Sequence, residues 1–139
     1  MKILAIDPGS KHIGLAISDP TGTISRPLLI LHHRSRIEDN EKILSIALEE
    51  GVDTVIVGQS LEDDGEPSFE GRRSARMAES LKERLNIPIV LWNEGFSTLD
   101  ARHTRIQAGG SRKKRRGHLD DVAAAIILQS YLDAQADGR

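Results

Sequence analysis

The sequence predicts an α/β fold in which helices flank both faces of a mixed five-stranded sheet. Near the N-terminus, short apolar runs are joined by connections that contain Gly and Pro, a pattern typical of antiparallel strands. Two later runs, residues 53–58 and 88–92, are short, apolar and partly β-branched, which is typical of buried parallel strands. Helical patterns alternate with these later runs, so the crossovers between them should be right-handed.

The first three strands form an antiparallel meander in this prediction. Residues 2–6 and 13–17 are paired as a hairpin, with Asp7 at the end of the first run. Residues 19–22 read Asp-Pro-Thr-Gly, which is a turn sequence. A third strand follows at residues 24–31, and its Pro27 favours the edge of the sheet.

The helices are predicted from apolar periodicity and from residues that begin or end helices. Gly51 ends the first helix, and Ser97-Thr98-Leu99-Asp100 resembles a capping box that begins the third. The unbroken basic run after Gly109-Gly110 is predicted to be a mobile loop. The predicted helices span residues 36–50, 69–85, 97–107 and 119–134.

Length and composition fit a globular protein with a real core. The 139 residues fit one domain, and 38% hydrophobic with 29% charged residues is ordinary for such a protein. There is no cysteine, which excludes disulfides and Cys-based zinc sites. No apolar run reaches the roughly 20 residues of a membrane span, and no secretory leader is evident. We expect a cytoplasmic protein.

Two acidic side chains are placed where α/β proteins carry function. Asp7 ends the first strand, and Glu94 follows the strand at residues 88–92. In a parallel arrangement, ligands bind at the carboxyl ends of strands. A carboxylate at the end of a buried strand is also costly unless a cation, hydrogen-bond donors or a metal compensates for it.

The last helix offers a third acid. Asp120 lies on one helical stripe with Ala124, Ile127 and Tyr131, so it continues the side that packs on the sheet. Asp121 aligns instead with Ala124 and Leu128 and is the second choice. Adjacent residues lie about 100° apart on a helix, so the two acids should not both face one site.

Three converging carboxylates without matching cations would repel one another strongly. Divalent hard cations relieve that repulsion, and ligands that are all oxygen select Mg²⁺ or Mn²⁺. Two such ions form the standard device for phosphodiester hydrolysis. The pattern therefore predicts a nuclease site, with Asp7, Glu94 and Asp120 as both metal ligands and catalytic residues.

Charge is segregated although the net charge is only −2. Four acids gather at residues 62–66, whereas the basic run directly precedes the acids of the last helix. With four aromatic residues, base stacking is not expected as the main binding mode. The five histidines are scattered and are expected to be ordinary surface or packing residues. The cations predicted to bind phosphates are Arg73, Arg76, Arg112, Lys113, Lys114, Arg115 and Arg116.

Each feature also has a simpler interpretation. Asp7-Pro8-Gly9 could be only a turn, and Glu94 could be a solvated loop acid. Asp120 and Asp121 could cap the last helix and complement its dipole, which is the more common role for acids at that position. The joint pattern is stronger than any of its parts.

In combination, the motifs resemble the YqgF (RuvX) family, whose members are described as pre-16S ribosomal RNA nucleases and also as Holliday junction resolvases. The resemblance covers nearly the whole chain. The residues that carry it are Asp7-x-Gly9, Ile13-Gly14-Leu15-Ala16, Ser18-Asp19, Val57-Gly58, Asn93-Glu94-x-x-Ser97-Thr98, Asp120-x-x-Ala123-Ala124 and Ile127-Leu128-Gln129.

The resemblance implies an RNase H-like fold, with three metal-binding acids that map onto Asp7, Glu94 and Asp120. The length fits one domain, which the resemblance identifies as an RNase H-like nuclease domain over residues 1–135, and the polar tail at 136–139 is expected to be disordered. The resemblance also implies a bacterial cytoplasmic protein that acts on structured nucleic acid. Family members usually carry Asp-Glu-Arg where this chain has Asn93-Glu94-Gly95, a departure that removes a charge and a phosphate contact.

Three functions are compared. The first is a metal-dependent endonuclease, which processes the 5′ end of pre-16S rRNA or else resolves Holliday junctions. The second is a nucleic-acid-binding assembly factor on the same fold without catalysis. The third is an actin-like or sugar-kinase-like phosphotransferase, because Asp-x-Gly before a second strand also forms a phosphate loop; that class needs two lobes, and one domain cannot supply both. The protein could be a monomer or a homodimer, and a junction resolvase would need a twofold dimer.

Overall fold

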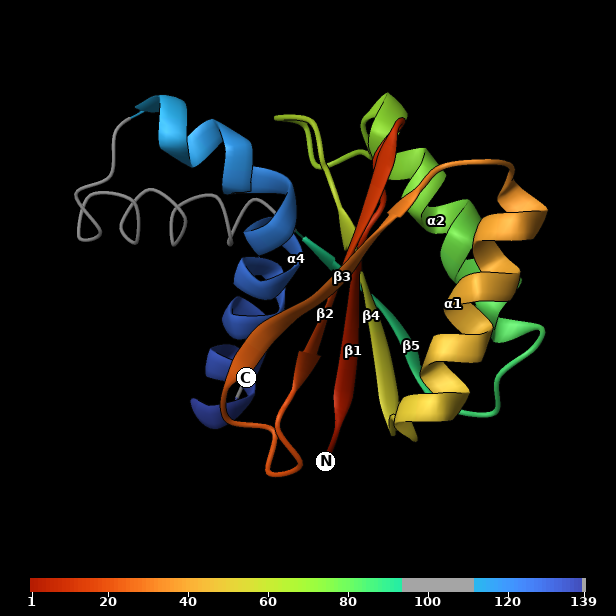
Figure 1. The fold of residues 1–139 in the computed structure, drawn as a ribbon, viewed down its shortest axis with the longest axis vertical. Coiled ribbons are helices and arrows are strands. Elements are labelled where there is room, and N and C mark those ends of the chain that lie inside the picture. Colours follow the sequence, from red (N-terminus) through yellow and green to blue (C-terminus); the bar gives the residue numbers. More distant parts are fainter. Residues whose placement is uncertain (94–111, 139) are drawn as a thin grey trace.

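The computed structural model describes residues 1–93 and 112–138, with the backbone alone over residues 112–121. It contains one five-stranded sheet in the order β3-β2-β1-β4-β5 (Figure 1). The described elements are β1 (Ile3–Asp7), β2 (His12–Ser18), β3 (Ser25–His32), α1 (Arg36–Glu50), β4 (Thr54–Gln59), α2 (Phe69–Lys82), β5 (Ile89–Asn93) and α4 (Arg112–Ala136).

The strand pairing confirms the predicted mixed sheet. β1 pairs with β2 and β2 with β3 in antiparallel fashion, whereas β1–β4 and β4–β5 are parallel. The β2–β3 ladder shifts register between Leu15 and Ala16. Pro27 lies in β3, at one edge of the sheet, where a missing N–H costs no ladder bond.

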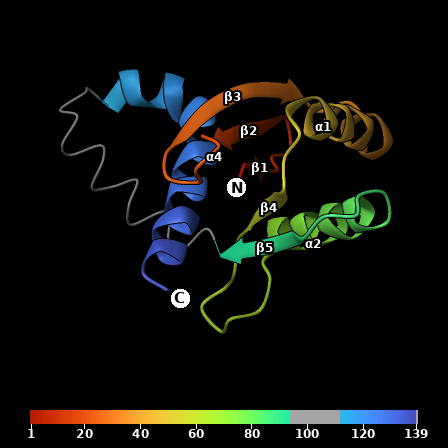
Figure 2. The ribbon, with the colours of Figure 1, turned by 90° about the horizontal axis from the view of Figure 1, so that it is seen from below.

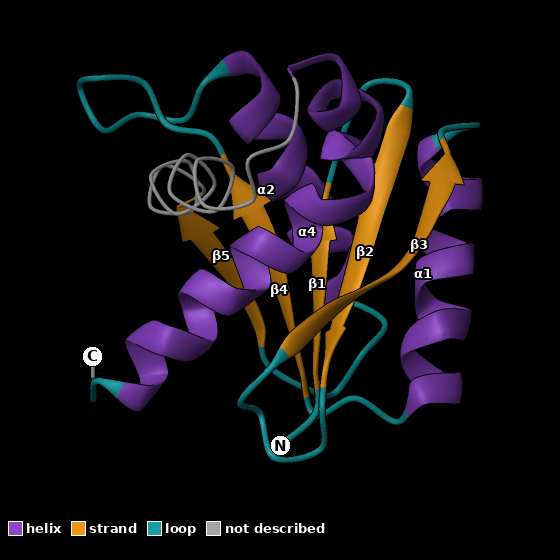
Figure 3. Ribbon diagram, turned by 60° about the vertical axis from the view of Figure 1, so that its left-hand side comes forward, coloured by secondary structure: helices purple, strands orange, loops and turns teal. Residues whose placement is uncertain are grey.

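Helices cover both faces of the sheet, as predicted. α1 and α2 lie on one face and α4 crosses the other (Figures 2 and 3). β1 is buried on both faces: Leu4 and Ile6 belong to the core under α1 and α2, whereas Ile3 and Ala5 belong to the core under α4. This two-sided burial explains why the strand reads as a continuous apolar run rather than an alternating one.

Local signals account for the bounds of α1 and α2. The hydroxyl of Ser35 accepts a hydrogen bond from the N–H of Glu38 at 3.1 Å, and Gly51 ends α1 in the left-handed region at φ 61°. The Arg36–Glu50 span of α1 confirms the prediction. α2 ends at Lys82 instead of residue 85, because the amides of residues 84 and 85 both donate to Leu81 O in a tightened last turn.

The prediction of a mobile loop at the basic run was wrong. α4 begins at Arg112, so residues 112–116 occupy its first turns and the helix starts seven residues before the predicted 119. Arg and Lys are good helix formers and no proline interrupts this stretch, so the helix extends through it. The helix predicted at residues 97–107 lies outside the described residues. Of the described helices, none is both long and apolar enough to span a membrane.

Candidate active site

The carboxyl ends of the three parallel strands meet at one edge of the sheet. β1 ends at Asp7, β4 at Gln59 and β5 at Asn93, and both α2 and α4 begin at this edge (Figures 1 and 3). Asp7 is half-buried, and its backbone pairs with Gly14 of β2. A half-buried carboxylate on the central strand is therefore held in a fixed position at this edge.

The connection that follows Asp7 is tight. A Cβ atom at Gly9 would lie 2.3 Å from the carbonyl oxygen of His12, a distance that no side chain tolerates. Glycine therefore lets the chain reverse directly into β2. The Asp-Pro-Gly segment thus serves as a turn and also places the carboxylate of Asp7.

The other predicted acids are placed only by their positions in the chain. Glu94 follows Asn93, the last residue of β5, and lies outside the described residues. Asp120 and Asp121 lie in α4, and their side chains are outside the described set. Downstream on α4, Ala124, Ile127 and Leu128 are all buried. Because both candidate stripes pack on the sheet, burial does not distinguish Asp120 from Asp121.

The donor set fits a hard divalent ion. Asp7 supplies carboxylate oxygens at the edge where the strands end, and the two other predicted ligands are also carboxylates. Among residues 1–93 and 122–138, no cluster of three His, Asp or Glu side chains could hold a metal. Glu94, Asp120 and Asp121 lie outside these ranges.

The start of α2 is fastened to the end of β4. The N–H and hydroxyl of Ser68 donate to the carbonyl oxygen of Ser60 at 3.0 and 3.1 Å, and Ser68 also caps the helix. The side-chain amide of Gln59 donates a hydrogen bond to the carbonyl oxygen of Gly71 at 3.2 Å. A Cβ at Gly71 would lie 2.1 Å from Ser60 O, so this close approach requires glycine.

This anchored helix carries the predicted phosphate-binding arginines. Arg76 is exposed and Arg73 half-buried, and neither forms an ion pair within the described part of the chain. Phe69, the first residue of α2, is 70% exposed, and the guanidinium carbon of Arg72 lies 5.8 Å from its ring centre. This exposed aromatic was not predicted from the sequence.

The acidic patch forms a folded loop at the same edge. A bridge between Leu61 and Pro67 closes it, and Glu62 N–H donates to Glu66 O at 2.7 Å. All four acidic side chains of the loop are exposed. The loop therefore adds negative charge beside the end of β4.

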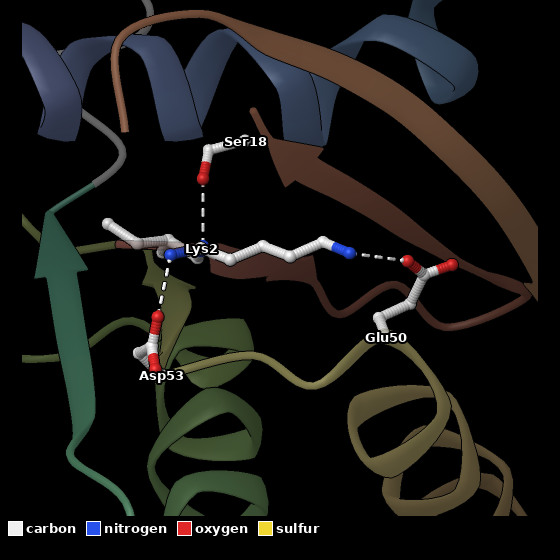
Figure 4. Close-up of polar contacts among 5 residues, drawn as sticks. Lys2, Ser18, Glu50 and Asp53 are labelled. Atoms are coloured by element: carbon white, nitrogen blue, oxygen red, sulfur yellow. Dashed lines mark hydrogen bonds and ion pairs between the residues drawn. The ribbon is translucent and has the colours of Figure 1, made fainter. Parts of the chain in front are cut away.

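Ser18, part of the motif that resembles the family, lies at the opposite edge and is structural. Its buried hydroxyl accepts a hydrogen bond from the N–H of Ile3 at 2.8 Å (Figure 4). In the same view, the carboxylate of Asp53 accepts from Lys2 N–H at 2.8 Å, and the Lys2 ammonium contacts Glu50 at 3.0 Å. These contacts fasten the start of β1 to neighbouring segments.

Asp19 organises the β2–β3 turn. Hydrogen bonds from Ile24 N–H, the Thr21 hydroxyl and Thr23 N–H hold the pKa of its carboxyl well below the usual 3.8. The bonds from the Thr23 and Ile24 amides measure 2.8 and 2.9 Å. Asp19 therefore has a turn-forming role far from Asp7.

Comparisons with known proteins agree with this architecture. The chain matches the family model described as "RuvX: Holliday junction resolvase" over residues 1–134. A protein of Thermoanaerobacter pseudethanolicus is 41% identical over 136 residues, which cover 97% of this chain and 98% of that protein. A protein of Geobacillus thermodenitrificans is 39% identical over 137 residues, which cover 97% and 99%. Both carry the name "Putative pre-16S rRNA nuclease".

Solved structures share the fold at low sequence identity. "T. thermophilus RuvC in complex with Holliday junction substrate" aligns with a TM-score of 0.67 at 15% identity, covering 99% of this chain and 96% of that one. The structure of the fowlpox virus resolvase with Holliday junction DNA aligns with a TM-score of 0.58 at 16% identity, covering 97% and 99%. The fold is RNase H-like, as the resemblance implied.

Proposed function

The chain belongs to the RuvX family, and from that premise we propose that it is a metal-dependent endonuclease that processes the 5′ end of pre-16S rRNA. The names of its close relatives support the substrate. We further propose that the protein acts in the bacterial cytoplasm. One observation carries the chemistry. Asp7 is a half-buried carboxylate at the carboxyl end of the central strand, beside the end of β4, with the end of β5 one strand further along the same edge.

Asp7, Glu94 and Asp120 would hold Mg²⁺ or Mn²⁺, with Asp121 as the alternative on α4. When bound, two such ions supply an activated water and stabilise the oxygen that leaves the phosphorus. The chain's own contribution is rigid placement of the ligands. Asp7 belongs to a strand that is paired on both sides, and the turn at Gly9 fixes its exit.

The cations would hold the polyanion. Arg73 and Arg76 project from a helix fastened to β4, and the five basic residues at 112–116 occupy the first turns of α4. Cations at a helix N-terminus oppose the helix dipole, and the first turn of α4 carries no acid to offset them. Bound phosphates would relieve this unfavourable arrangement, which supports a binding role for the basic run.

Cleavage of a labelled pre-16S rRNA fragment in Mg²⁺ tests the proposal. We expect Asp7→Asn and Glu94→Gln to lose about 100-fold or more in rate, because a metal contributes several kcal/mol to the barrier. Asp120→Asn and Asp121→Asn, measured side by side, identify the third ligand by the larger loss. Asp63→Asn is the matched control, since it removes an exposed acid at the same edge. The assignment of Asp7 as a catalytic metal ligand would be overturned if wild type leaves the RNA intact, or if Asp7→Asn cleaves it at the wild-type rate.

A second candidate is a Holliday junction resolvase, which the family's description favours. Symmetric cleavage of a four-way junction needs two active sites related by a twofold axis. The same assay with a DNA junction, together with the solution mass, separates the two substrates. An assembly factor without catalysis would instead still bind nucleic acid tightly after the predicted acidic ligands are replaced. Its binding would weaken when the basic residues at 112–116 are neutralised.

A further inference from the structure

We propose a second surface for the nucleic-acid backbone, formed by Lys11, Arg34 and Arg36 with the histidine pair His12–His32. This inference rests on the proposed function, because it concerns how a structured nucleic acid, pre-rRNA or a four-way junction, is held at the same site. None of these residues belongs to the predicted site. The surface lies where the start of β2, the end of β3 and the start of α1 meet.

Strand register brings the surface to the edge that carries Asp7. Asp7 pairs with Gly14, and His12 lies two residues nearer the start of β2, opposite His32 at the end of β3. The two imidazole rings lie 4.9 Å apart in an edge-to-face contact. The N–H of His33 donates to Lys11 O at 2.8 Å, so the segments that carry Lys11 and Arg34 lie side by side.

The pleat directs the histidine pair to one face of the sheet. Ile13 and Leu15 pack in the core under α1 and α2, whereas Ala16 packs under α4. Side chains alternate along a strand, so His12 faces the α4 side. The first turns of α4, with the basic run, lie at the same end of the molecule as the start of β2 (Figure 3).

A buried acid holds the segment in place. Asp39 is 2% exposed, and its carboxylate contacts His33 Nδ1 at 2.5 Å and accepts from Arg34 N–H at 3.1 Å. Ser35 then caps α1. Asp39 thus contacts His33 and the backbone of Arg34, whereas the side chains of Arg34 and Arg36 remain exposed.

The three cations, Lys11, Arg34 and Arg36, are exposed side chains without an ion pair among the described residues. Cations on an edge strand can also prevent strand addition, but that role needs charge along the strand. Here Lys11 lies just before β2, and Arg34 and Arg36 lie beyond the end of β3, in the loop and the first turn of α1.

The acidic loop shows which partner fits. Its carboxylates lie beside the end of β4, two strands from β2 in the sheet, at the same edge. The edge therefore carries negative charge beside β4 and positive charge beside β3. A polyanion bound near Asp7 is repelled by the acidic loop and attracted by the cations near the start of β2. The partner that fits this surface is therefore a nucleic-acid backbone.

Salt-dependent binding of the full chain to a fluorescein-labelled DNA four-way junction, measured in EDTA, tests this surface apart from cleavage. Each phosphate contact adds about 0.9 to the slope of log K against log salt, so Lys11→Gln/Arg34→Gln/Arg36→Gln should lower the slope by about 2.7. Wild type should then lose about 40-fold more affinity than this variant between about 50 and 200 mM salt. The control triple, Arg26→Gln/Lys42→Gln/Lys82→Gln, removes the same charge from exposed positions away from this surface and should keep the wild-type slope.

The inference would be overturned if the two triple variants have the same salt-dependence slope. This holds whether both slopes equal that of wild type or both are lowered by the same amount. If the test triple does not fold by circular dichroism, Arg34→Gln alone should lower the slope by about 0.9. The rRNA cleavage assay reads the proposed function separately. If wild type does not cleave the RNA but the two triple variants still differ in slope, the nuclease proposal is contradicted and the proposed surface stands. If wild type cleaves the RNA and the two triple variants have equal slopes, only the proposed surface is contradicted.

Discussion

Replacing Gly71 by alanine tests how the structure places the phosphate-binding helix. The added methyl carbon would lie 2.1 Å from the carbonyl oxygen of Ser60 and must move to at least 3.0 Å. The clash is with backbone on both sides, so no flexible side chain can absorb it. The start of α2 must therefore shift away from the end of β4.

The magnitude follows from three contributions. Overpacking of this kind costs about 1–3 kcal/mol. The shift also stretches the bonds from Ser68 to Ser60 O and from Gln59 to Gly71 O, each worth about 1 kcal/mol net. Alanine regains about 1 kcal/mol through its helix propensity. If all three of these bonds are lost, the contributions add to a net loss of about 3–5 kcal/mol in the free energy of unfolding.

Urea unfolding of the full chain, followed by circular dichroism, measures this loss. Glu70→Ala is the matched control, because it changes an exposed neighbour in the same turn without a clash and should cost under about 1 kcal/mol. The displaced helix should also weaken phosphate binding by Arg73. A Gly71→Ala protein as stable as wild type, or more stable, would show that α2 does not approach β4 as described.

Three further predictions concern stability. Ser18→Ala leaves the buried N–H of Ile3 without its acceptor and should cost about 1–3 kcal/mol in urea unfolding; a neutral result would show that the N–H finds another partner. Leu128→Ala opens a cavity between α4 and the sheet and should cost about 2–5 kcal/mol, whereas Leu48→Ala, at 73% exposed, should cost far less. Asp19→Asn should lower the melting temperature at neutral pH. Because the pKa of Asp19 is depressed below 3.8 in the fold, its stabilisation is present above that pH and is lost as the pH falls below it. The difference in melting temperature between Asp19→Asn and wild type should therefore become smaller in acid. A difference that stays constant with pH would contradict the role of the Asp19 charge.

The sheet could be predicted because its signals are local. Two-sided burial makes the interiors of β1 and β4 apolar, and Gly51 marks the end of α1. The basic run misled the prediction because charge and a preceding Gly pair favour a loop, whereas Arg and Lys also propagate a helix. Here the helix-forming tendency prevailed.

The histidines show what spacing along the chain cannot reveal. His12 and His32 are twenty residues apart and meet only because the β2–β3 register aligns them. That register includes a shift between Leu15 and Ala16, and a slip of one residue would send one ring to the opposite face. Positions in the sequence could place Asp7 at a strand end, but contacts across strands depend on register.

The choice between Asp120 and Asp121 has a related cause. A narrow apolar stripe on α4 would point to one acid, but Ala124, Ala125, Ile127 and Leu128 are all buried under or beside the sheet. With so wide a buried side, a helical rotation of about 100° still leaves either acid in line with core residues. The two acids differ by only about 1.5 Å in height along α4 but by about 100° in direction, so the discriminating quantity is which of them is directed at Asp7, and a wide buried side does not reveal it. Paired Asn substitutions at these two positions identify that acid by the larger loss of activity, because only an acid directed at Asp7 can share a metal with it.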